Sequence, residues 1–189
     1  MRRTLDRLLS WIGLVIALIL LLAGGLLWWA SAFVGNQVQA QLDMQNITMP
    51  AADQLETDAQ KQALERYAGE PMTTGEQAKA YADNYILVHM NAASDGRTYS
   101  EVSGEFMQLS SDPNADPEKV AELAQLRQTL FMGNTLRGLL LNAYAFDTIS
   151  NIARIASLVA LVGGCIMLVL VGLGLSHGEL NEDDEPATT

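Results

Sequence analysis

Cysteine, histidine and basic residues are scarce in this sequence of 189 residues, and each scarcity excludes a class of function. The single cysteine, Cys165, has no partner for a disulfide bond, so packing must hold the folded parts together. The two histidines, His89 and His177, lie on either side of the apolar run that contains Cys165, which excludes a metal site with two histidine ligands from one chain. Only 11 Lys and Arg residues stand against 22 Asp and Glu residues, and this acidic balance argues against nucleic acid as a partner.

A catalytic constellation is also missing from the sequence pattern. Ser100 and Ser103 lack the G-x-S-x-G elbow of a nucleophilic serine, and His89 alone does not make a triad. The methionines show no repeated M-x-x-M spacing that would favour Cu(I), so we interpret them as core residues. We therefore expect no enzyme activity, no cofactor and no metal site.

Two long runs without any charged residue, 11–34 and 155–175, dominate what is present. At about 1.5 Å of helical rise per residue they reach roughly 36 and 32 Å, enough to cross a hydrocarbon core of about 30 Å. Trp11 stands at one end of the first run and Trp28 and Trp29 near the other, where amphipathic rings settle at membrane interfaces. The pattern predicts a transmembrane helical hairpin.

Basic residues set the expected orientation. Arg2, Arg3 and Arg7 precede the first run, and no Lys or Arg follows it until Lys61, so the positive-inside rule places the N-terminus in the cytoplasm of a cell-membrane protein. The predicted parts are a basic cytoplasmic N-terminus (1–10), a first span (11–34), an extracytoplasmic helical domain (35–150), a second span (151–175) and an acidic cytoplasmic tail (176–189).

A cleaved signal peptide is the alternative interpretation of the N-terminus. Arg2 and Arg3 would form its basic region, and residues 30–32 resemble an A-x-A cleavage site. The apolar run is longer than the usual 7 to 15 residues, which favours an uncleaved anchor. Both interpretations leave the middle of the chain outside the cytoplasm.

The middle of the chain has the periodicity of helices and no strand pattern. We expect the first helix to continue until Pro50, and two further helices over 53–68 and 75–93. The helix over 53–68 would place on one face Leu55, Ala59, Ala63 and Tyr67. The helix over 75–93 carries apolar residues on two sides and should be the most buried of the bundle.

Local signals mark the next two helix starts. Thr98 and Glu101 have the spacing of a capping box, and Asp116 before Pro117 is the preferred start of a long final helix. The fold class predicted is all-α, with a helical-bundle domain inserted between two transmembrane helices.

The segment 129–149 is apolar enough to be considered as a third span. Arg137 would then lie near mid-bilayer at a cost of roughly 2.5 to 3.5 kcal/mol, so we assign the segment to the bundle. Arg137 then needs a carboxylate partner or lies against lipid headgroups. Together with Asp147 and Arg154 it forms the candidate set for interaction or lipid contact.

Small residues recur at helical spacing in both apolar runs. They are Ser10, Ala17, Gly24 and Ser31 at steps of seven, and Ala156, Ala160 and Gly164 at steps of four. Such stripes let helix backbones approach closely, either between the two spans or against a larger partner.

Several motifs carry a resemblance to a known group of proteins. These are the runs 67–69, 81–83 and 98–100, and above all 127–133 and 135–144, which begin at Arg127 and Thr135. With them the chain resembles a group of uncharacterised two-span membrane proteins of actinobacteria, over most of residues 37–175. Some members carry an aromatic ring-opening dioxygenase label. The resemblance implies no activity, because non-haem iron dioxygenases need clustered histidine and carboxylate ligands that His89 alone cannot supply.

The leading functional hypothesis is a non-enzymatic accessory or scaffolding subunit of a larger envelope complex. The alternatives are an extracytoplasmic ligand-sensing module that works with a separate signalling partner, and an enzyme or lipid-binding protein at the outer leaflet. The partners expected are membrane lipid and other membrane or envelope proteins, or a second copy of the chain.

Overall fold

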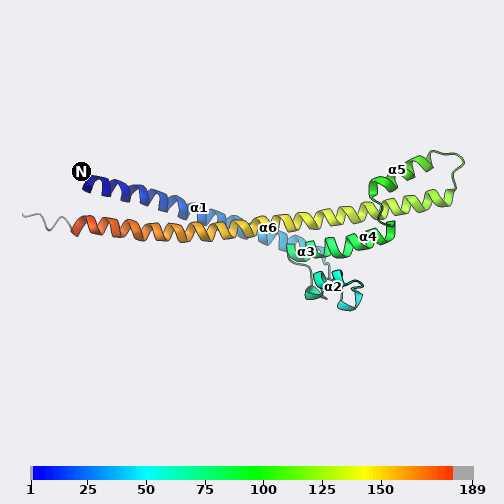
Figure 1. The fold of residues 1–189 in the computed structure, drawn as a ribbon, viewed down its shortest axis with the longest axis horizontal. Helices are drawn as coiled ribbons and strands as arrows, with labels where there is room; N and C mark the ends of the chain where they lie inside the picture. Colours follow the sequence, from blue (N-terminus) through cyan, green and yellow to red (C-terminus); the bar gives the residue numbers. More distant parts are fainter. Residues whose placement is uncertain (1, 181–189) are drawn as a thin grey trace, which may run out of the picture. The chain divides into compact units, whose positions relative to one another are not determined.

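The computed structural model describes the backbone of residues 2–180 and the side chains of residues 8–176. The long helices are α1 (Arg2–Gln45) and α6 (Pro117–Leu180) (Figure 1). Between them come η1 (Ala52–Gln54), α2 (Asp58–Leu64), η2 (Glu65–Tyr67), α3 (Gly75–Tyr81), η3 (Ala82–Ile86), α4 (Leu87–Ser94) and α5 (Tyr99–Ser110). Within the described range there is no strand, so the all-helical class is confirmed. The acidic tail beyond 180 and the side chains of Arg2, Arg3 and Arg7 lie outside what is described.

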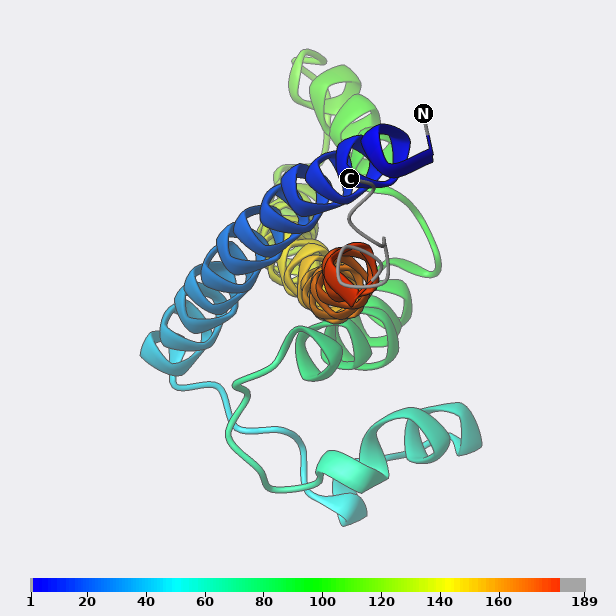
Figure 2. The same cartoon turned by 90° about the vertical axis from the view of Figure 1, so that its left-hand side faces the viewer.

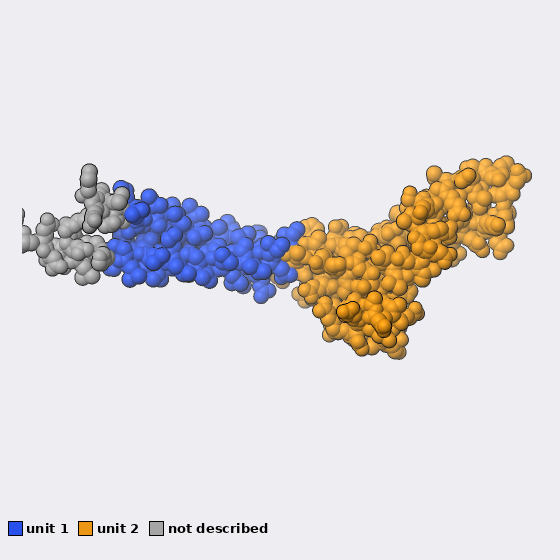
Figure 3. All heavy atoms as spheres, viewed as in Figure 1, with its two compact units in different colours: residues 1–35, 149–189 blue, residues 36–148 orange. Residues whose placement is uncertain are grey.

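The chain divides into two compact units, which Figure 3 colours separately. Unit 1 consists of residues 1–35 and 149–189, and unit 2 of residues 36–148. The boundaries predicted for the middle domain were 35 and 150. Both units take part of their structure from α1 and α6.

Unit 1 is a pair of antiparallel helices that lie side by side (Figure 1). The helices α1 and α6 are each long and apolar enough to cross a membrane. Only 17% of the most apolar window of α1 and 11% of that of α6 is buried. Most of their Leu, Ile and Val side chains therefore point away from the protein, as expected where lipid is the surrounding medium.

Unit 2 is built on the part of α6 that belongs to it. The segment α3–η3–α4 lies alongside α6 in both views of the fold (Figures 1 and 2). A side chain at Gly75, the first residue of α3, would overlap with Tyr144 and Asp147 of α6, and one at Gly133 of α6 would overlap with Met90 of α4. The segment therefore packs at the close distance that only small residues allow.

Two short connecting segments, around Met49 and around Met72, pair with each other. The backbone N–H of Met49 donates to the carbonyl of Glu70, and the N–H of Met72 donates to the carbonyl of Ile47, both at 2.8 Å. The Met49 and Met72 side chains are almost fully buried, as expected of core residues, and Met90 is buried as well. The core interpretation is wrong for Met44, Met107 and Met132, which are exposed.

Capping boxes start three of the helices. The predicted box of Thr98 and Glu101 is confirmed at the start of α5, and α6 begins at Pro117 with the Asp116 carboxylate accepting from the N–H of Glu118 at 3.0 Å. Thr57 and Thr74 form equivalent boxes before α2 and α3.

The predicted bounds of two helices were wrong. The first helix ends at Gln45, before Pro50, because Asn46 adopts a left-handed conformation (φ 50°) that terminates it. The helix expected over 53–68 is only α2 with the flanking turns η1 and η2, because the Thr57 cap starts it late. Leu55 is buried but precedes this helix, whose buried residues are Gln60 and Leu64.

The helix expected over 75–93 contains a π-turn, η3, at its centre. The extra residue of a π-turn changes which side chains face the core. The sequence pattern places Ala78, Ala82 and His89 on one side of this helix and Ile86 and Met90 on the opposite side. In the structure Ala78, Ala82, Ile86 and Met90 are all buried, whereas His89 is exposed.

Candidate functional site

Arg137, a candidate from the sequence, belongs to a small ion-pair network with Asp83 and Lys79. Its guanidinium donates to the Asp83 carboxylate of η3 at 2.8 Å, and the Lys79 ammonium of α3 donates to the other oxygen of the same carboxylate at 2.6 Å. The hydrogen bond from Lys79, and then that from Arg137, hold the pKa of Asp83 below its ordinary value. Arg137 thus has the carboxylate partner that its partial burial requires.

One donor of the Arg137 side chain is left without a hydrogen-bond partner by this ion pair. Its Nε is buried without a hydrogen-bond partner, while the side chain as a whole remains 30% exposed. The geometry fits a structural tie between η3 and α6, and the π-turn aims Asp83 at α6. The sequence indicates the need for a carboxylate but does not identify Asp83, which lies 54 positions away along the chain.

The other two candidates do not join Arg137. Asp147 lies ten positions further along α6, about 15 Å of helix, and is half-buried against the start of α3 at Gly75. A carboxylate near the start of a helix is in a favourable place. Arg154 belongs to unit 1 and is exposed.

His89 has an ordinary role in the structure. Its Nδ1 lies 2.7 Å from the carbonyl oxygen of Tyr85, and because a carbonyl only accepts, Nδ1 carries the proton. The ring also contacts Tyr85 at a tilted angle, and Tyr85 in turn stacks on Tyr81. No group of three His, Cys, Asp or Glu side chains able to hold a metal is found among the described residues.

The contact between the two helices of unit 1 is regular. The Ser150 hydroxyl donates to the carbonyl oxygen of Ser31 at 2.8 Å, and the Ser157 hydroxyl donates to the carbonyl oxygen of Gly24 at 2.7 Å. One step further, a Cβ on Gly164 would stand 3.3 Å from the carbonyl oxygen of Ala17. We call these three layers the seam.

The layers of the seam follow each other at steps of seven on both helices, in opposite directions. A repeat of seven keeps the same face of two helices in contact along a left-handed supercoil. The positions of α1 in the seam are those of the predicted small-residue stripe, and Ser10 of that stripe is also buried. The backbones approach so closely that a Cβ on Gly24 would stand 2.8 Å from Cγ of Leu161.

On α6 the seam differs from the expected stripe. Ala156 is exposed and Ala160 is half-buried, and only Gly164 of the three predicted residues lies in a layer. The residues that the sequence reasoning missed are Ser150 and Ser157. A signal for them exists, because Ser150, Ser157, Gly164 and Val171 repeat at steps of seven, as the stripe on α1 does. All four are buried.

Two tryptophans and one arginine of unit 1 lie at the same height along the helix pair, between two layers of the seam. Trp28 and Trp29 lie between the layers of Gly24 and Ser31, and Arg154 lies between the corresponding layers of Ser157 and Ser150. All three side chains are exposed, as are the interfacial residues of membrane helices.

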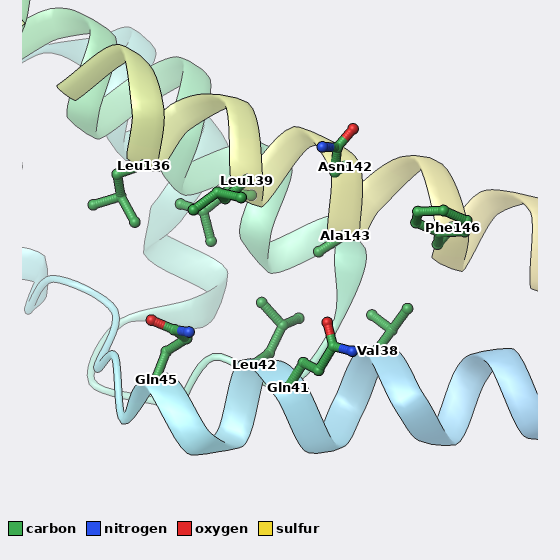
Figure 4. A pocket seen from close by; sticks show the side chains of 10 residues that line it. Val38, Gln41, Leu42, Gln45, Leu136, Leu139, Asn142, Ala143 and Phe146 are labelled. Carbon is green, nitrogen blue, oxygen red and sulfur yellow. The ribbon is translucent and has the colours of Figure 1, made fainter. Parts of the chain in front are cut away.

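An apolar groove lies elsewhere, in unit 2 between α1 and α6 (Figure 4). It has a volume of about 310 Å³. Its lining consists of Val38, Gln41, Leu42, Gln45, Leu136, Leu139, Leu140, Asn142, Ala143 and Phe146. None of the candidate residues from the sequence lies in it.

Comparisons of the chain with protein-family models, with curated proteins and with solved structures give no match.

Proposed function

We propose that this chain is a two-span integral membrane protein that acts as a non-enzymatic accessory or scaffolding subunit of a larger envelope complex. In this proposal both termini are cytoplasmic and residues 35–150 form a helical domain outside the cytoplasm, inserted between the spans. Arg137 and Asp147 stabilise the outer domain, and Arg154 lies at the outer interface of the membrane.

The observation that carries the membrane assignment is the exposure of the two apolar helices. A core helix of a soluble protein is mostly buried, whereas here only 17% and 11% of the most apolar windows are covered by protein. Because covering one Leu, Ile or Phe side chain is worth about 1.5 to 3 kcal/mol, so many exposed apolar side chains need an apolar medium. A bilayer supplies this medium.

The seam supports an uncleaved first span. If α1 were removed after residue 32, the hydroxyls of Ser150 and Ser157 would lose the carbonyl acceptors of Ser31 and Gly24. Small residues in contact and serine hydroxyls bonded across helices are typical of transmembrane pairs. The second span thus has its packing partner in α1.

The orientation follows from charge. The first apolar run is preceded by Arg2, Arg3 and Arg7, and the second run begins beside the single basic residue Arg154. Cytoplasmic flanks carry the excess of basic residues, which favours cytoplasmic termini. The level of Trp28, Trp29 and Arg154 is then the outer interface.

The accessory role is supported by apolar side chains that unit 2 leaves uncovered. Phe131 and Met132 on α6 and Met107 on α5 are each more than half exposed. Exposed apolar surface on a water-facing domain marks interaction sites. A surface of this kind suits a protein partner.

The test is purification of the tagged full-length chain from native membranes in a mild detergent, with quantitative mass spectrometry. The proposal expects one or more envelope proteins in a fixed ratio to the chain, absent from a parallel purification of an unrelated two-span protein. A Phe131→Ser variant should recover less of the partner at equal expression. Isolation of the chain as a lone monomer under the same conditions would contradict the proposal.

A further inference from the structure

The repeat of the seam determines which side chains border it along one side of the helix pair in unit 1. A Cβ on Gly24 would meet the side chain of Leu161, and a Cβ on Gly164 would meet the side chain of Leu21. Leu21 and Leu161 each follow a layer residue by four positions, and equivalent positions of two antiparallel helices lie on the same side of the pair. Both leucines are half-buried. We call this side of the seam the flank.

The flank changes in character one repeat further along the seam. Trp28 follows Leu21 by seven positions on α1, and Arg154 precedes Leu161 by seven positions on α6. Trp28 and Arg154 therefore take the positions that the two leucines hold one repeat away. Both are exposed, and the exposed fraction of Trp28 is 47%. An indole and a guanidinium thus stand at the end of the flank, and two leucines stand next to them along the helices.

The charge of Arg154 is not balanced within the described part of unit 1. Among residues 8–35 and 149–176 Arg154 is the only charged residue, so this part of the chain supplies no carboxylate. The positive-inside rule disfavours a basic residue at the outer end of a span, so orientation does not explain an arginine at this position. A cation beside a lipid-facing surface is stabilised by an anion, and here the anion must come from outside unit 1.

The polar side chains at this end of the flank can all donate hydrogen bonds. Asn151 is exposed and lies three positions before Arg154, and residues three apart are neighbours on a helix. The indole N–H of Trp28 only donates, and a guanidinium has five N–H donors and no acceptor. A negatively charged ligand with several acceptor oxygens matches these groups. The planar fork of an arginine fits a phosphate group in particular.

We propose that the flank binds one phospholipid, with its phosphate held by Arg154 and Asn151 beside the Trp28 ring, and with an acyl chain along Leu21 and Leu161. Phosphate groups are the anions of the membrane interface, the level at which tryptophan rings settle. The order of polar and apolar side chains along the flank follows that of headgroup and acyl chain. This site rests on the two spans of the proposed function and does not depend on the accessory role.

The test is native mass spectrometry of the full-length protein in a neutral detergent, titrated with phosphatidylglycerol, with diacylglycerol or with inorganic phosphate. Diacylglycerol has the acyl chains without the phosphate, and inorganic phosphate has the anion without the chains. We expect wild type to bind phosphatidylglycerol, and to bind diacylglycerol about tenfold more weakly because the charge-assisted hydrogen bonds are missing. An excess of inorganic phosphate should not displace the bound phospholipid.

A pair of arginine variants tests the phosphate contact. Arg154→Gln should weaken the binding of phosphatidylglycerol about tenfold, because it removes the charge and the fork of donors. Arg66→Gln removes the same charge from an exposed arginine of unit 2 and should leave the binding unchanged. Arg154→Lys should bind with intermediate affinity, since an ammonium keeps the charge without the planar fork.

A pair of tryptophan variants tests the position of the lipid on the helix pair. Trp28→Leu should weaken the binding of phosphatidylglycerol about threefold, because the indole ring and its N–H donor are lost. Trp29→Leu makes the same change about 100° further round α1, outside the flank, and should have no effect. Helix content by circular dichroism checks that each variant is folded.

The proposal is overturned if folded Arg154→Gln binds phosphatidylglycerol as wild type does, or if Arg66→Gln weakens the binding equally. Equal affinity for diacylglycerol, displacement of the phospholipid by inorganic phosphate, or equal effects of the two tryptophan substitutions would also overturn it. Phospholipid binding can be lost in a protein that has two spans and a protein partner, and it can be found in a protein without a partner. The two proposals can therefore fail separately.

Discussion

Replacement of Gly24 by leucine tests the packing of the two apolar helices, because its neighbour Gly25 provides the same change in a different environment. A Cβ on Gly24 would stand 2.8 Å from Cγ and 3.2 Å from the backbone nitrogen of Leu161, whereas a Cβ on Gly25 would meet nothing within 4 Å. Gly24→Leu must therefore push α1 and α6 apart. Gly25→Leu places its side chain on the outward surface of the pair.

The expected difference follows from known costs. Overpacking of a close contact costs about 1 to 3 kcal/mol, and loss of the hydrogen bond from Ser157 to Gly24 adds about 0.6 kcal/mol, up to about 1.7. Gly24→Leu should thus lower the free energy of unfolding by about 2 to 4 kcal/mol. Gly25→Leu should be neutral or stabilising, because leucine has the better helix propensity and favours the bilayer by about 0.3 to 0.6 kcal/mol.

The assay is equilibrium unfolding of the full-length protein in mixed micelles of a neutral detergent and dodecyl sulfate, followed by circular dichroism. Wild type and the Gly25→Leu variant should unfold at similar dodecyl sulfate fractions, and the Gly24→Leu variant at a clearly lower one. Equal destabilisation by the two substitutions, or no effect of either, would refute the seam as described.

The remaining predictions concern the ion-pair network and the serine hydroxyls. Asp83→Asn should destabilise the protein more than Arg137→Gln, because Asp83 accepts hydrogen bonds from two cations. A double-mutant cycle of Asp83 and Arg137 should give a coupling energy of about 0.2 to 1 kcal/mol. A coupling energy of zero would show that this ion pair contributes nothing to stability. Because Lys79 and Arg137 lower the pKa of Asp83, their contribution is complete above the ordinary value of 3.8 and is lost as the pH falls through the lowered value. Thermal stability should therefore fall more steeply below about pH 4 in wild type than in Asp83→Asn, and parallel curves would contradict this assignment. Ser157→Ala should cost about 0.6 to 1.7 kcal/mol, and Ser176→Ala, at an exposed hydroxyl bonded within its own helix, clearly less; the reverse order would refute the interhelical bond.

Features that depend only on neighbouring residues, such as helix starts, could be predicted from the sequence. Thr98 with Glu101, and Asp116 with Pro117, determine helix starts through hydrogen bonds to nearby backbone groups, and both starts are confirmed. The two apolar helices were also predictable, since their composition alone is sufficient. The all-helical class follows from these elements.

Features that depend on a distant partner were not predictable in the same way. The seam on α6 uses Ser157 rather than Ala156, and the choice depends on the register against α1, which one helix alone does not specify. The π-turn at η3 shifts the buried row and brings Asp83 to Arg137, 54 positions away. The apolar groove depends on the distance between α1 and α6, and a local sequence pattern does not predict this distance.

The central claim is that two spans place residues 35–150 outside the cytoplasm, and site-directed labelling on intact cells tests it most directly. In a Cys165→Ala background, single cysteines are introduced at Asn114, in the exposed loop before α6, and at Glu182, in the acidic tail, and are treated with a membrane-impermeant maleimide. We predict labelling of Asn114→Cys in intact cells and of Glu182→Cys only after the cells are opened. Labelling of both positions from the same side of the membrane would contradict the two-span account.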